Sequence, residues 1–197
     1  MKEEKSAIFE SRLADAEARK VAGNQLFKDQ QWAAALQLYK QGLHHCEFDE
    51  MQFNFELLDE HRDQVIQIRV PLYLNASACA QKLQDFESSA EFCSEAMLLQ
   101  PDNAKTLFRR GVSYFQLRNY EKSKIDLSQA AKLQPQDKLV RKALVDLMGA
   151  MRQEELAAKK TWAGVFENHE EIAAPKSFCD RILSWISSYY NGHQKDE

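Results

Sequence analysis

Several features that mark common enzymes and nucleic-acid binders are absent from this sequence. It has no glycine-rich phosphate loop, no HExxH pair and no nucleophile beside a base, so common nucleotide-dependent and hydrolytic activities are not expected. Basic residues are not in excess, because 26 Lys and Arg stand against 30 Asp and Glu, a formal net charge of -4. General nucleic-acid binders usually carry a basic excess, so binding to nucleic acid is not expected either. We predict a protein that acts by binding, without a cofactor.

Paired cysteines and long apolar segments are also absent. Cys46, Cys79, Cys93 and Cys179 show no CxxC spacing, so we expect free, buried thiols in a reducing compartment. His44, His45 and Cys46 are consecutive and point in different directions on a helix, so a metal site there is not favoured. Neither a secretory signal nor an apolar run of membrane-spanning length is found. We therefore expect a cytoplasmic protein.

A repeat with a period of 34 residues organises the chain. Three pairs of like residues lie at this spacing: Ala96 and Ala130, Pro101 and Pro135, Phe86 and Tyr120. The period is typical of the tetratricopeptide repeat, a helix-turn-helix unit. At 197 residues and 44% hydrophobic, the chain can bury a core of its own. We predict an all-α, right-handed solenoid of three helix pairs, at 16–49, 70–103 and 104–137.

Small and aromatic residues recur at matching places in each predicted repeat. The first helix of each pair, helix A, carries a small residue where its partner, helix B, approaches closely: Gly23, Ser77 and Gly111. The turn between the two helices is followed by an aromatic residue: Trp32, Phe86 and Tyr120. Helix B of the first repeat carries Tyr39, which Cys93 and Leu127 replace in the other two. This pattern supports the frame of three repeats.

The segments outside the repeats are predicted to be mostly helical. Residues 1–15 extend the first helix, and residues 50–69 lengthen helix B of the first repeat and helix A of the second, with a turn between 53 and 60. Residues 138–165 are predicted to cap the solenoid through an apolar face made of Leu139, Ala143, Leu144, Leu147, Met148 and Met151. A basic amphipathic helix also resembles a calmodulin target, and this alternative stays open.

A last amphipathic helix is predicted near the C-terminal end of the sequence. After a linker at 166–176, residues 177–190 place Trp185 and two tyrosines on one apolar face, followed by a polar tail at 191–197. The helix could dock on the solenoid, hold a client or second protein, or lie on a membrane. Its polar face is not rich in Lys or Arg, so membrane contact is not favoured.

Cations and amides fall on the stripe of the A helices that would line the concave groove of such a solenoid. Lys105 and Arg109 lie four residues apart on one helical face, where their charges repel. Four more polar residues join them from the other two repeats: Lys20, Asn24, Asn75 and Lys82. Apolar neighbours on the stripe include Phe27, Ala78 and Phe108, and Glu17 at its edge is the only acid.

Such a set of side chains favours a carboxylate ligand. Lysine offers a point charge, arginine a planar fork and asparagine a directed amide donor. We predict that Lys20, Asn24, Asn75, Lys105 and Arg109 bind carboxylates, and that Phe27, Ala78, Lys82 and Phe108 line the groove beside them. The alternative is that these cations only solvate an open groove.

Three segments carry a resemblance to a known family: KVAGN at 20–24, LNASAC at 74–79 and NAKTLFRRG at 103–111. Over roughly residues 12–165 the sequence resembles the dicarboxylate-clamp repeats of co-chaperones, in particular FK-binding immunophilins and aryl-hydrocarbon-receptor-interacting proteins. The resemblance implies that the groove binds the C-terminal Glu-Glu-Val-Asp tail of a cytosolic heat-shock chaperone, the ninety-kilodalton one being favoured over the seventy-kilodalton one. Lys20, Asn24, Asn75 and Lys105 would hold the terminal carboxylate and the last Asp.

The resemblance also implies roles for the neighbouring residues. Arg109 and Lys82 would reach upstream groups of the tail, while Phe27, Ala78 and Phe108 would receive its apolar side chains. Two other interpretations stay open: a scaffold for a different acidic or carboxylate-ended partner, and the trimmed repeat region of an immunophilin isomerase. Only about fifteen residues precede the first repeat, too few for a catalytic domain, so no isomerase site is expected in this chain.

Overall fold

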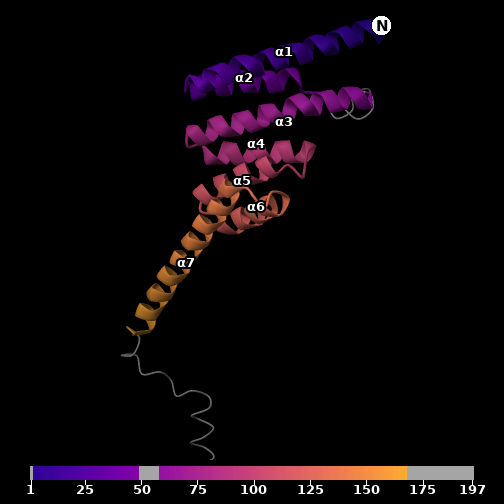
Figure 1. Ribbon diagram of the computed structural model, residues 1–197. Coiled ribbons are helices and arrows are strands. Elements are labelled where there is room, and N and C mark those ends of the chain that lie inside the picture. The colour runs from indigo at the N-terminus through magenta and orange to yellow at the C-terminus, as the bar shows by residue number, and fades with distance from the viewer. Residues whose placement is uncertain (1, 49–57, 168–197) are drawn as a thin grey trace, which may run out of the picture. The chain divides into compact units, whose positions relative to one another are not determined.

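The computed structural model describes the backbone of residues 2–48 and 58–167 and the side chains of residues 8–48 and 58–162. Over this part the chain is helical and contains no strand, so the predicted all-α class is confirmed (Figure 1). The helices are α1 (Lys2–Lys28), α2 (Trp32–His45), α3 (Asp59–Lys82), α4 (Phe86–Leu99), α5 (Ala104–Gln116), α6 (Tyr120–Leu133) and α7 (Lys138–Glu167). Contacts divide the chain into two units, residues 1–150 and residues 151–197.

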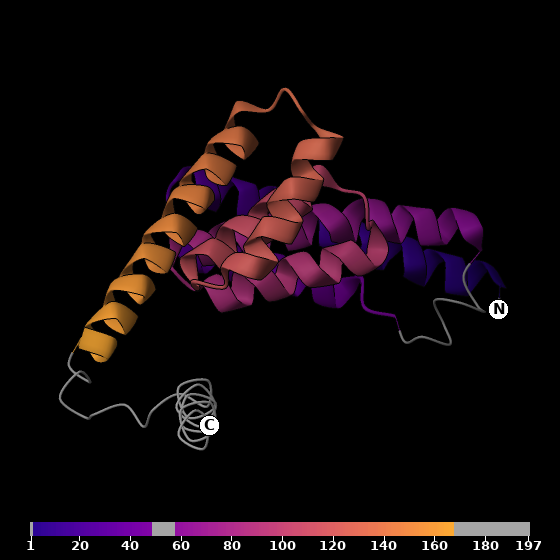
Figure 2. The same cartoon turned by 90° about the horizontal axis from the view of Figure 1, so that it is seen from below.

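The first unit is a stack of helices in chain order. Each helix from α1 to α5 packs against the one that follows it in the chain (Figure 2). In addition, α1 contacts α3, and α3 contacts α5. The odd-numbered helices α1, α3 and α5 therefore lie side by side, which is the arrangement that the predicted site requires. At 27 and 24 residues, α1 and α3 are much longer than α5, which has 13.

The same turn reverses the chain within each of the three helix pairs. Its central residue has a left-handed backbone, with φ of 61° at Gln30, 62° at Gln84 and 57° at Arg118. The residue after it donates its backbone N–H to a carbonyl five residues earlier: Gln31 to Leu26 (2.9 Å), Asp85 to Ala80 (2.9 Å) and Asn119 to Tyr114 (2.8 Å). This is the Schellman motif, which usually places glycine at the left-handed position. Because glutamine and arginine stand there instead, the residues at the left-handed position itself gave no indication of these turns.

Matched side-chain sizes set the close approach of the two helices in each pair. A Cβ added to Gly23 would lie 2.6 Å from Cε1 of Tyr39, and one added to Gly111 would lie 2.8 Å from Cγ of Leu127. In the second pair the facing residue is the small Cys93, and here helix A carries Ser77, whose Oγ lies 3.1 Å from the cysteine Sγ. A large residue on helix B thus faces glycine, and a small one leaves room for serine.

The segment between the first two pairs differs from its prediction. We expected residues 50–69 to lengthen both flanking helices, but α2 ends at His45. Arg12 donates from Nε to the His45 carbonyl (3.0 Å) and from a terminal nitrogen to the Glu47 carbonyl (2.5 Å). These bonds, together with the complete burial of Cys46, hold the end of α2. Only α3 gains length, beginning at Asp59, while the predicted turn lies largely in residues 49–57, outside the described part.

The packing face of α7 differs in two residues from its prediction. Val140 and Leu147 are buried, and Val140 packs with Leu107 and Ala130 of the third pair. Leu139 and Met148, which we placed on the packing face, are 65% and 67% exposed. Each neighbours a buried residue in sequence and so lies about 100° away around the helix. The other four residues of the predicted face are buried or half-buried.

The second unit is described only for the end of α7. Residues 152–162 are exposed along this stretch. The predicted helix at 177–190, most of the linker before it and the polar tail lie outside the described residues, and so does Cys179. The other three cysteines are free and buried, as predicted. None of the described helices is both long and apolar enough to cross a bilayer.

Candidate carboxylate-binding site

Contacts between α1, α3 and α5 join three of the five residues predicted to bind carboxylates. The Asn75 amide on α3 donates from Nδ2 to Oδ1 of Asn24 on α1, at 2.9 Å. The Arg109 guanidinium on α5 donates to the backbone carbonyl of Leu74, the residue next to Asn75. Lys20 and Lys105 each stand four residues before one of these, one helical turn away on the same face. We call the five residues Lys20, Asn24, Asn75, Lys105 and Arg109 the candidate clamp.

Tyr39 of α2 supports the candidate clamp from below. Its hydroxyl donates to Oδ1 of Asn24 at 2.8 Å, so this oxygen accepts two hydrogen bonds. Neither bond uses the Asn24 amide nitrogen, which remains to donate to a ligand. Burial raises the pKa of Tyr39 to about 12, and the charge of Arg109 acts in the opposite direction. The buried tyrosine is therefore within electrostatic reach of both ends of the clamp.

The three cations of the candidate clamp have different partners and surroundings. Lys20 forms an ion pair with Glu17, with 2.6 Å between Nζ and Oε2. Arg109 is half-buried and bonded to the Leu74 carbonyl, and burial lowers its pKa. Lys105 is exposed, and its pKa is lowered mainly by the charge of Arg109 and further by burial. Among the described residues neither Lys105 nor Arg109 has an acidic partner within ion-pair distance.

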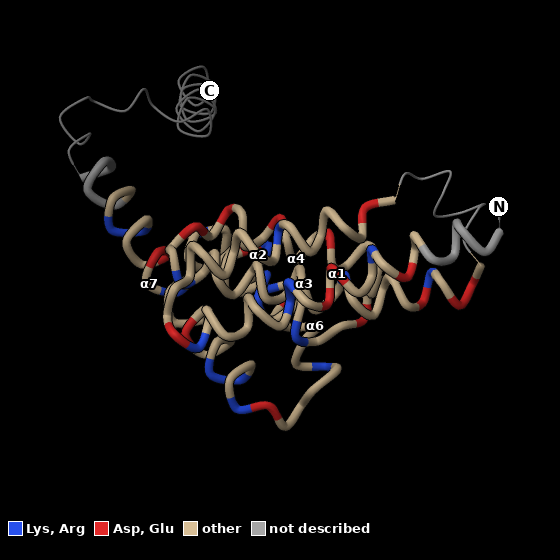
Figure 3. The backbone as a smooth tube through the Cα atoms, turned by 90° about the horizontal axis from the view of Figure 1, so that it is seen from above, with Lys and Arg blue, Asp and Glu red and all other residues tan. Residues whose placement is uncertain are grey.

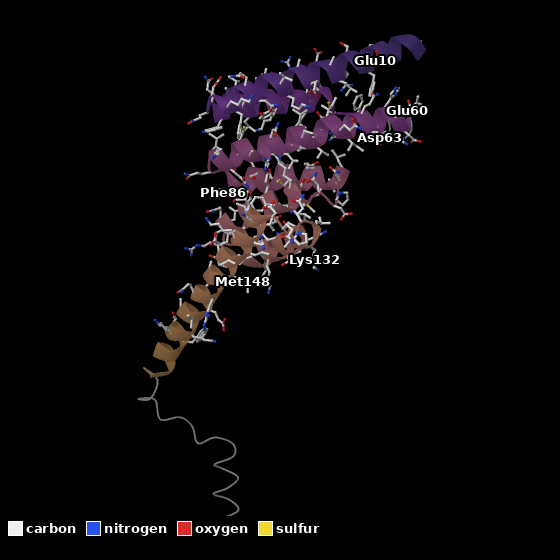
Figure 4. All side chains as sticks on the ribbon, viewed as in Figure 1. Glu10, Glu60, Asp63, Phe86, Lys132 and Met148 are labelled. Atoms are coloured by element: carbon white, nitrogen blue, oxygen red, sulfur yellow. The ribbon has the colours of Figure 1, made fainter. Side chains whose placement is uncertain are left out.

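Three acidic residues of α1 and α3 lie toward one end of these helices. Figure 4 shows Glu10, Glu60 and Asp63 near the N-terminal ends of α1 and α3, and the charges along each helix can be followed in Figure 3. Asp63 precedes Asn75 by twelve residues, about 18 Å along a helix. The centre of the candidate clamp therefore has positive charge and amide donors without a local acid, an arrangement that suits an anion.

A family model described as the tetratricopeptide repeat matches residues 104–137, which form α5 and α6. Residues 104–137 are thus a tetratricopeptide repeat. The matched residues are those assigned above to the third repeat, and the assignment of 16–49 and 70–103 as the first two remains a prediction.

Immunophilins and co-chaperones with such domains are similar to this chain. The peptidyl-prolyl cis-trans isomerase FKBP42 of Arabidopsis thaliana is 30% identical over 180 residues, which is 89% of this chain and 48% of that protein. The Hsp90 co-chaperone Cns1 of Saccharomyces cerevisiae superposes with a TM-score of 0.65 and 25% identity, over 78% of this chain and 45% of that one. The chain spans about a third to a half of the length of its curated relatives, from 34% to 48%.

A solved structure adds a likeness in fold alone. The first TPR of Spaghetti (RPAP3), bound to the HSP90 peptide SRMEEVD, has a TM-score of 0.57 and 22% identity. The match covers 71% of this chain and 95% of that one.

A polar network that sequence analysis missed holds the Arg109 backbone in the repeat domain. Gln81 of α3 donates from Nε2 to the Arg109 carbonyl and to Oγ of Ser113, both at 3.0 Å. Ser113 lies 2.8 Å from Ser89 of α4, which lies 2.9 Å from Ser77. The network ties α3, α4 and α5 together directly behind the clamp. Its only signal in the sequence was a glutamine and three small hydroxyl residues within apolar helices.

Arg110 has a structural role, although it is adjacent to Arg109. It faces away from the clamp and forms two parallel bonds with Asp126 of α6, from Nε at 2.7 Å and from a terminal nitrogen at 2.8 Å. The Asp126 side chain is only 3% exposed and that of Arg110 21%. The hydrogen bond with Asp126 raises the pKa of Arg110. Of the two neighbouring arginines, only Arg109 lacks an acid.

The residues predicted to line the groove lie in different surroundings. Lys82 places its Nζ 5.7 Å from the ring centroid of Trp32, and the Phe27 ring packs edge-on against the same tryptophan at 4.7 Å. Ala78 is half-buried, one turn beyond Asn75. Phe108 is half-buried too, but it packs against the core of the third helix pair. Phe27 and Lys82 thus share a contact near the C-terminal ends of α1 and α3, seven residues beyond Asn75 on the latter.

The chemistry available at the candidate clamp is that of binding. It offers ammonium, guanidinium and amide donors, and its one carboxylate, Glu17, is already paired with Lys20. The three buried thiols have pKa values raised to about 11 by burial, which keeps them protonated and unreactive at neutral pH. No group of three His, Cys, Asp or Glu side chains suited to a metal ion occurs in the described part of the chain. His45 accepts a hydrogen bond from Arg19, and Cys46 is buried in the core.

Proposed function

We propose that this chain is a co-chaperone adaptor that binds the acidic C-terminal Glu-Glu-Val-Asp tail of a cytosolic heat-shock chaperone. Lys20, Asn24, Asn75, Lys105 and Arg109 act as a dicarboxylate clamp for the terminal carboxylate and the last Asp side chain. The observation that carries the proposal is the pair Lys105 and Arg109, which has no acidic partner within ion-pair distance among the described residues and adjoins the bonded amides of Asn24 and Asn75. A ligand carboxylate supplies the charge that this place lacks.

The charges of the ligand-free site favour the binding of such a ligand. Lys105 and Arg109 repel each other on one face of α5, and Arg109 is partly withdrawn from water. A carboxylate placed between them relieves the repulsion and replaces the neutral Leu74 carbonyl with a charged acceptor for Arg109. Hydrogen bonds between ions are roughly twice as strong as neutral ones. The network through Gln81 holds α5 in place, so little reorganisation of the backbone is required.

The similar proteins support this class of partner. Cns1 is named an Hsp90 co-chaperone, and the RPAP3 domain, which shares the fold, is bound to a peptide ending in Glu-Glu-Val-Asp. We favour the ninety-kilodalton chaperone over the seventy-kilodalton one as partner, because Cns1 is named an Hsp90 co-chaperone. Binding, without catalysis, is the proposed activity, and the isomerase activity in the relatives' names is not assigned to this chain. A client or second protein held by residues 177–190 completes the adaptor.

The test is a calorimetric titration with the peptide Ser-Arg-Met-Glu-Glu-Val-Asp, as the free acid and as the C-terminal amide. We expect salt-dependent binding of the free acid with Kd on the order of 1–100 μM, because a short peptide buries little area and depends on a few charged contacts. We expect the amide to bind at least about tenfold more weakly, since it lacks one charge-assisted acceptor. Equal binding of both peptides, or of neither, would contradict the proposed clamp.

Substitutions locate the site. Lys105→Ala and Arg109→Ala should each weaken binding of the free acid at least about tenfold. Lys124→Ala removes the same charge from an exposed position on α6 and is the matched control, with binding close to that of the native domain. If the control weakened binding as much as Lys105→Ala, net charge would account for the affinity, and the clamp assignment would be wrong.

A further inference from the structure

One acid lies within reach of the clamp's cations, and its position is specific. Glu17 stands one turn before Lys20 on α1 and places Oε2 2.6 Å from the lysine Nζ. The Lys20 side chain is only 19% exposed, whereas that of Glu17 is 46% exposed. The lysine is thus largely enclosed, and the acid covers part of its remaining approach from solvent.

The corresponding place in the third helix pair has the opposite charge. Lys105 is the second residue of repeat 104–137, and the second residue of repeat 16–49 is Glu17. The two ends of the clamp therefore differ in the ligand-free domain. In the described part of the chain no acid lies within ion-pair distance of Lys105 or Arg109, while at Lys20 a carboxylate of the protein is already in place.

We infer that Glu17 is a specificity-determining residue that competes with the ligand's carboxylate for Lys20. The inference rests on the proposed function, because it concerns the same site. A ligand carboxylate that approaches Lys20 meets both the Glu17 charge and a lysine whose exposed surface is small. It binds there only by displacing Glu17 or by sharing Lys20 with it, and each costs free energy.

Glu17 has a second physical effect, which acts in the opposite direction. By holding Lys20 it lowers the side-chain entropy that a ligand would otherwise have to remove. Competition outweighs this effect because the enclosed Lys20 stem is already restricted by its burial, so Glu17 adds little further order. The sign of the change in affinity when Glu17 loses its charge therefore separates a competitor from a positioning residue.

The consequence concerns how strongly the clamp distinguishes ligands by their number of carboxylates. A ligand with one carboxylate is held at Lys105 and Arg109 and is not affected by Glu17. A ligand with two gains at Lys20 only the excess of its own carboxylate over Glu17. Glu17 thereby reduces the preference of the clamp for ligands that reach both of its ends, and Glu17→Gln should increase that preference.

The experiment compares Glu17→Gln with the native domain in the same titration. The substitution keeps the size of the side chain, removes its charge and should tighten binding of the free-acid peptide about two- to five-fold, the range for a partly exposed ion pair. Asp15→Asn is the matched control: it removes one charge from an exposed residue on the other side of α1, so we expect a smaller change. In a Lys20→Ala background, Glu17→Gln should give no gain.

The possible outcomes separate the inference from the proposal on which it rests. Weaker binding by Glu17→Gln would make Glu17 a positioning residue, and a gain equal to that of Asp15→Asn would reduce its effect to net charge. Either result, with native binding intact, overturns the inference alone. Failure of the native domain to bind the free acid overturns the proposed function and the inference with it.

Discussion

Adding one methyl group to each of two helical glycines should change stability in opposite directions. A Cβ at Gly111 would lie 2.8 Å from Cγ and 2.9 Å from Cδ2 of Leu127, a side chain that is fully buried and cannot move aside. A Cβ at Gly149 of α7 would meet no atom within 4 Å. Both substitutions to alanine gain about 1 kcal/mol in helix propensity. Only Gly111→Ala adds an overpacking cost, which is about 1–3 kcal/mol.

The difference between the two variants isolates the packing cost, because the gain in propensity is common to both. We expect Gly149→Ala to be more stable than the native domain by up to about 1 kcal/mol, and Gly111→Ala to fall below Gly149→Ala by about 1–3 kcal/mol. Urea unfolding followed by far-ultraviolet circular dichroism measures both at pH 7. Leu127→Ala in the Gly111→Ala background should show positive coupling, since it removes the clash. Equal stability of the two alanine variants would refute the packing argument.

Three further changes test other parts of the structure. Gln84→Gly should stabilise the domain by about 0.5–1 kcal/mol, because Gln84 has a left-handed backbone (φ 62°) that glycine adopts without strain. Gln37→Gly, within α2, should destabilise it by a similar amount. Urea unfolding measures both, and a loss of stability in both variants would contradict the strain at Gln84. Asp126→Asn should lower the stability of the domain by about 3 kcal/mol, because it leaves the Arg110 guanidinium without its buried acid. Glu155→Gln, in the exposed pair with Lys159, should leave the thermal midpoint unchanged. Equal shifts of the thermal midpoint in the two variants would show that the Arg110 pair contributes no more to stability than an exposed pair. The folded state keeps the protons of its buried thiols, whose pKa values are raised from 9.0 to about 11. The stability that these thiols contribute should therefore be constant below pH 9 and be lost between pH 9 and 11. A profile of thermal midpoints that stays flat over that range would disprove the effect.

The sequence predicted the class of fold well because its main signal is periodic. Alanine, proline and aromatic residues spaced at 34 residues indicate a helix pair whatever the remaining residues are, and the all-α structure confirms this class. Helix ends were harder to predict, because they depend on single contacts from distant residues. Arg12 bonds to the carbonyls at the end of α2 from 33 and 35 residues away, and no local pattern around His45 announces this. Leu139 and Met148 of α7 were assigned to the packing face for a similar reason, since apolar residues lie on more than one side of this helix.

For the candidate clamp too, the sequence predicted which residues share a helical face but not which groups they contact. Helical spacing placed Lys105 and Arg109 on one face without an acid, and the structure shows their mutual repulsion and no acidic partner among the described residues. Spacing could not show that Arg109 bonds to the carbonyl of Leu74 or that Gln81 holds its backbone, because main-chain partners carry no signature of residue type. Spacing placed Arg109, and not Arg110, on the groove stripe, but it could not show that Arg110 pairs with Asp126, sixteen residues later.

The pairing of residue sizes between helices has a consequence for how such a domain can be rebuilt. Gly23 fits the ring of Tyr39, Ser77 fits the sulfur of Cys93, and Gly111 fits the branch of Leu127. The first helix of the second pair is therefore not interchangeable with those of the other two, since it would place Ser77 where the Tyr39 ring or the Leu127 side chain leaves no room for it. A chimera assembled from whole pairs keeps every fit, whereas one that joins α3 to the second helix of another pair does not. The unit that can be exchanged without loss of packing is thus the matched helix pair. Its boundaries lie between pairs and not at the tight turns within them.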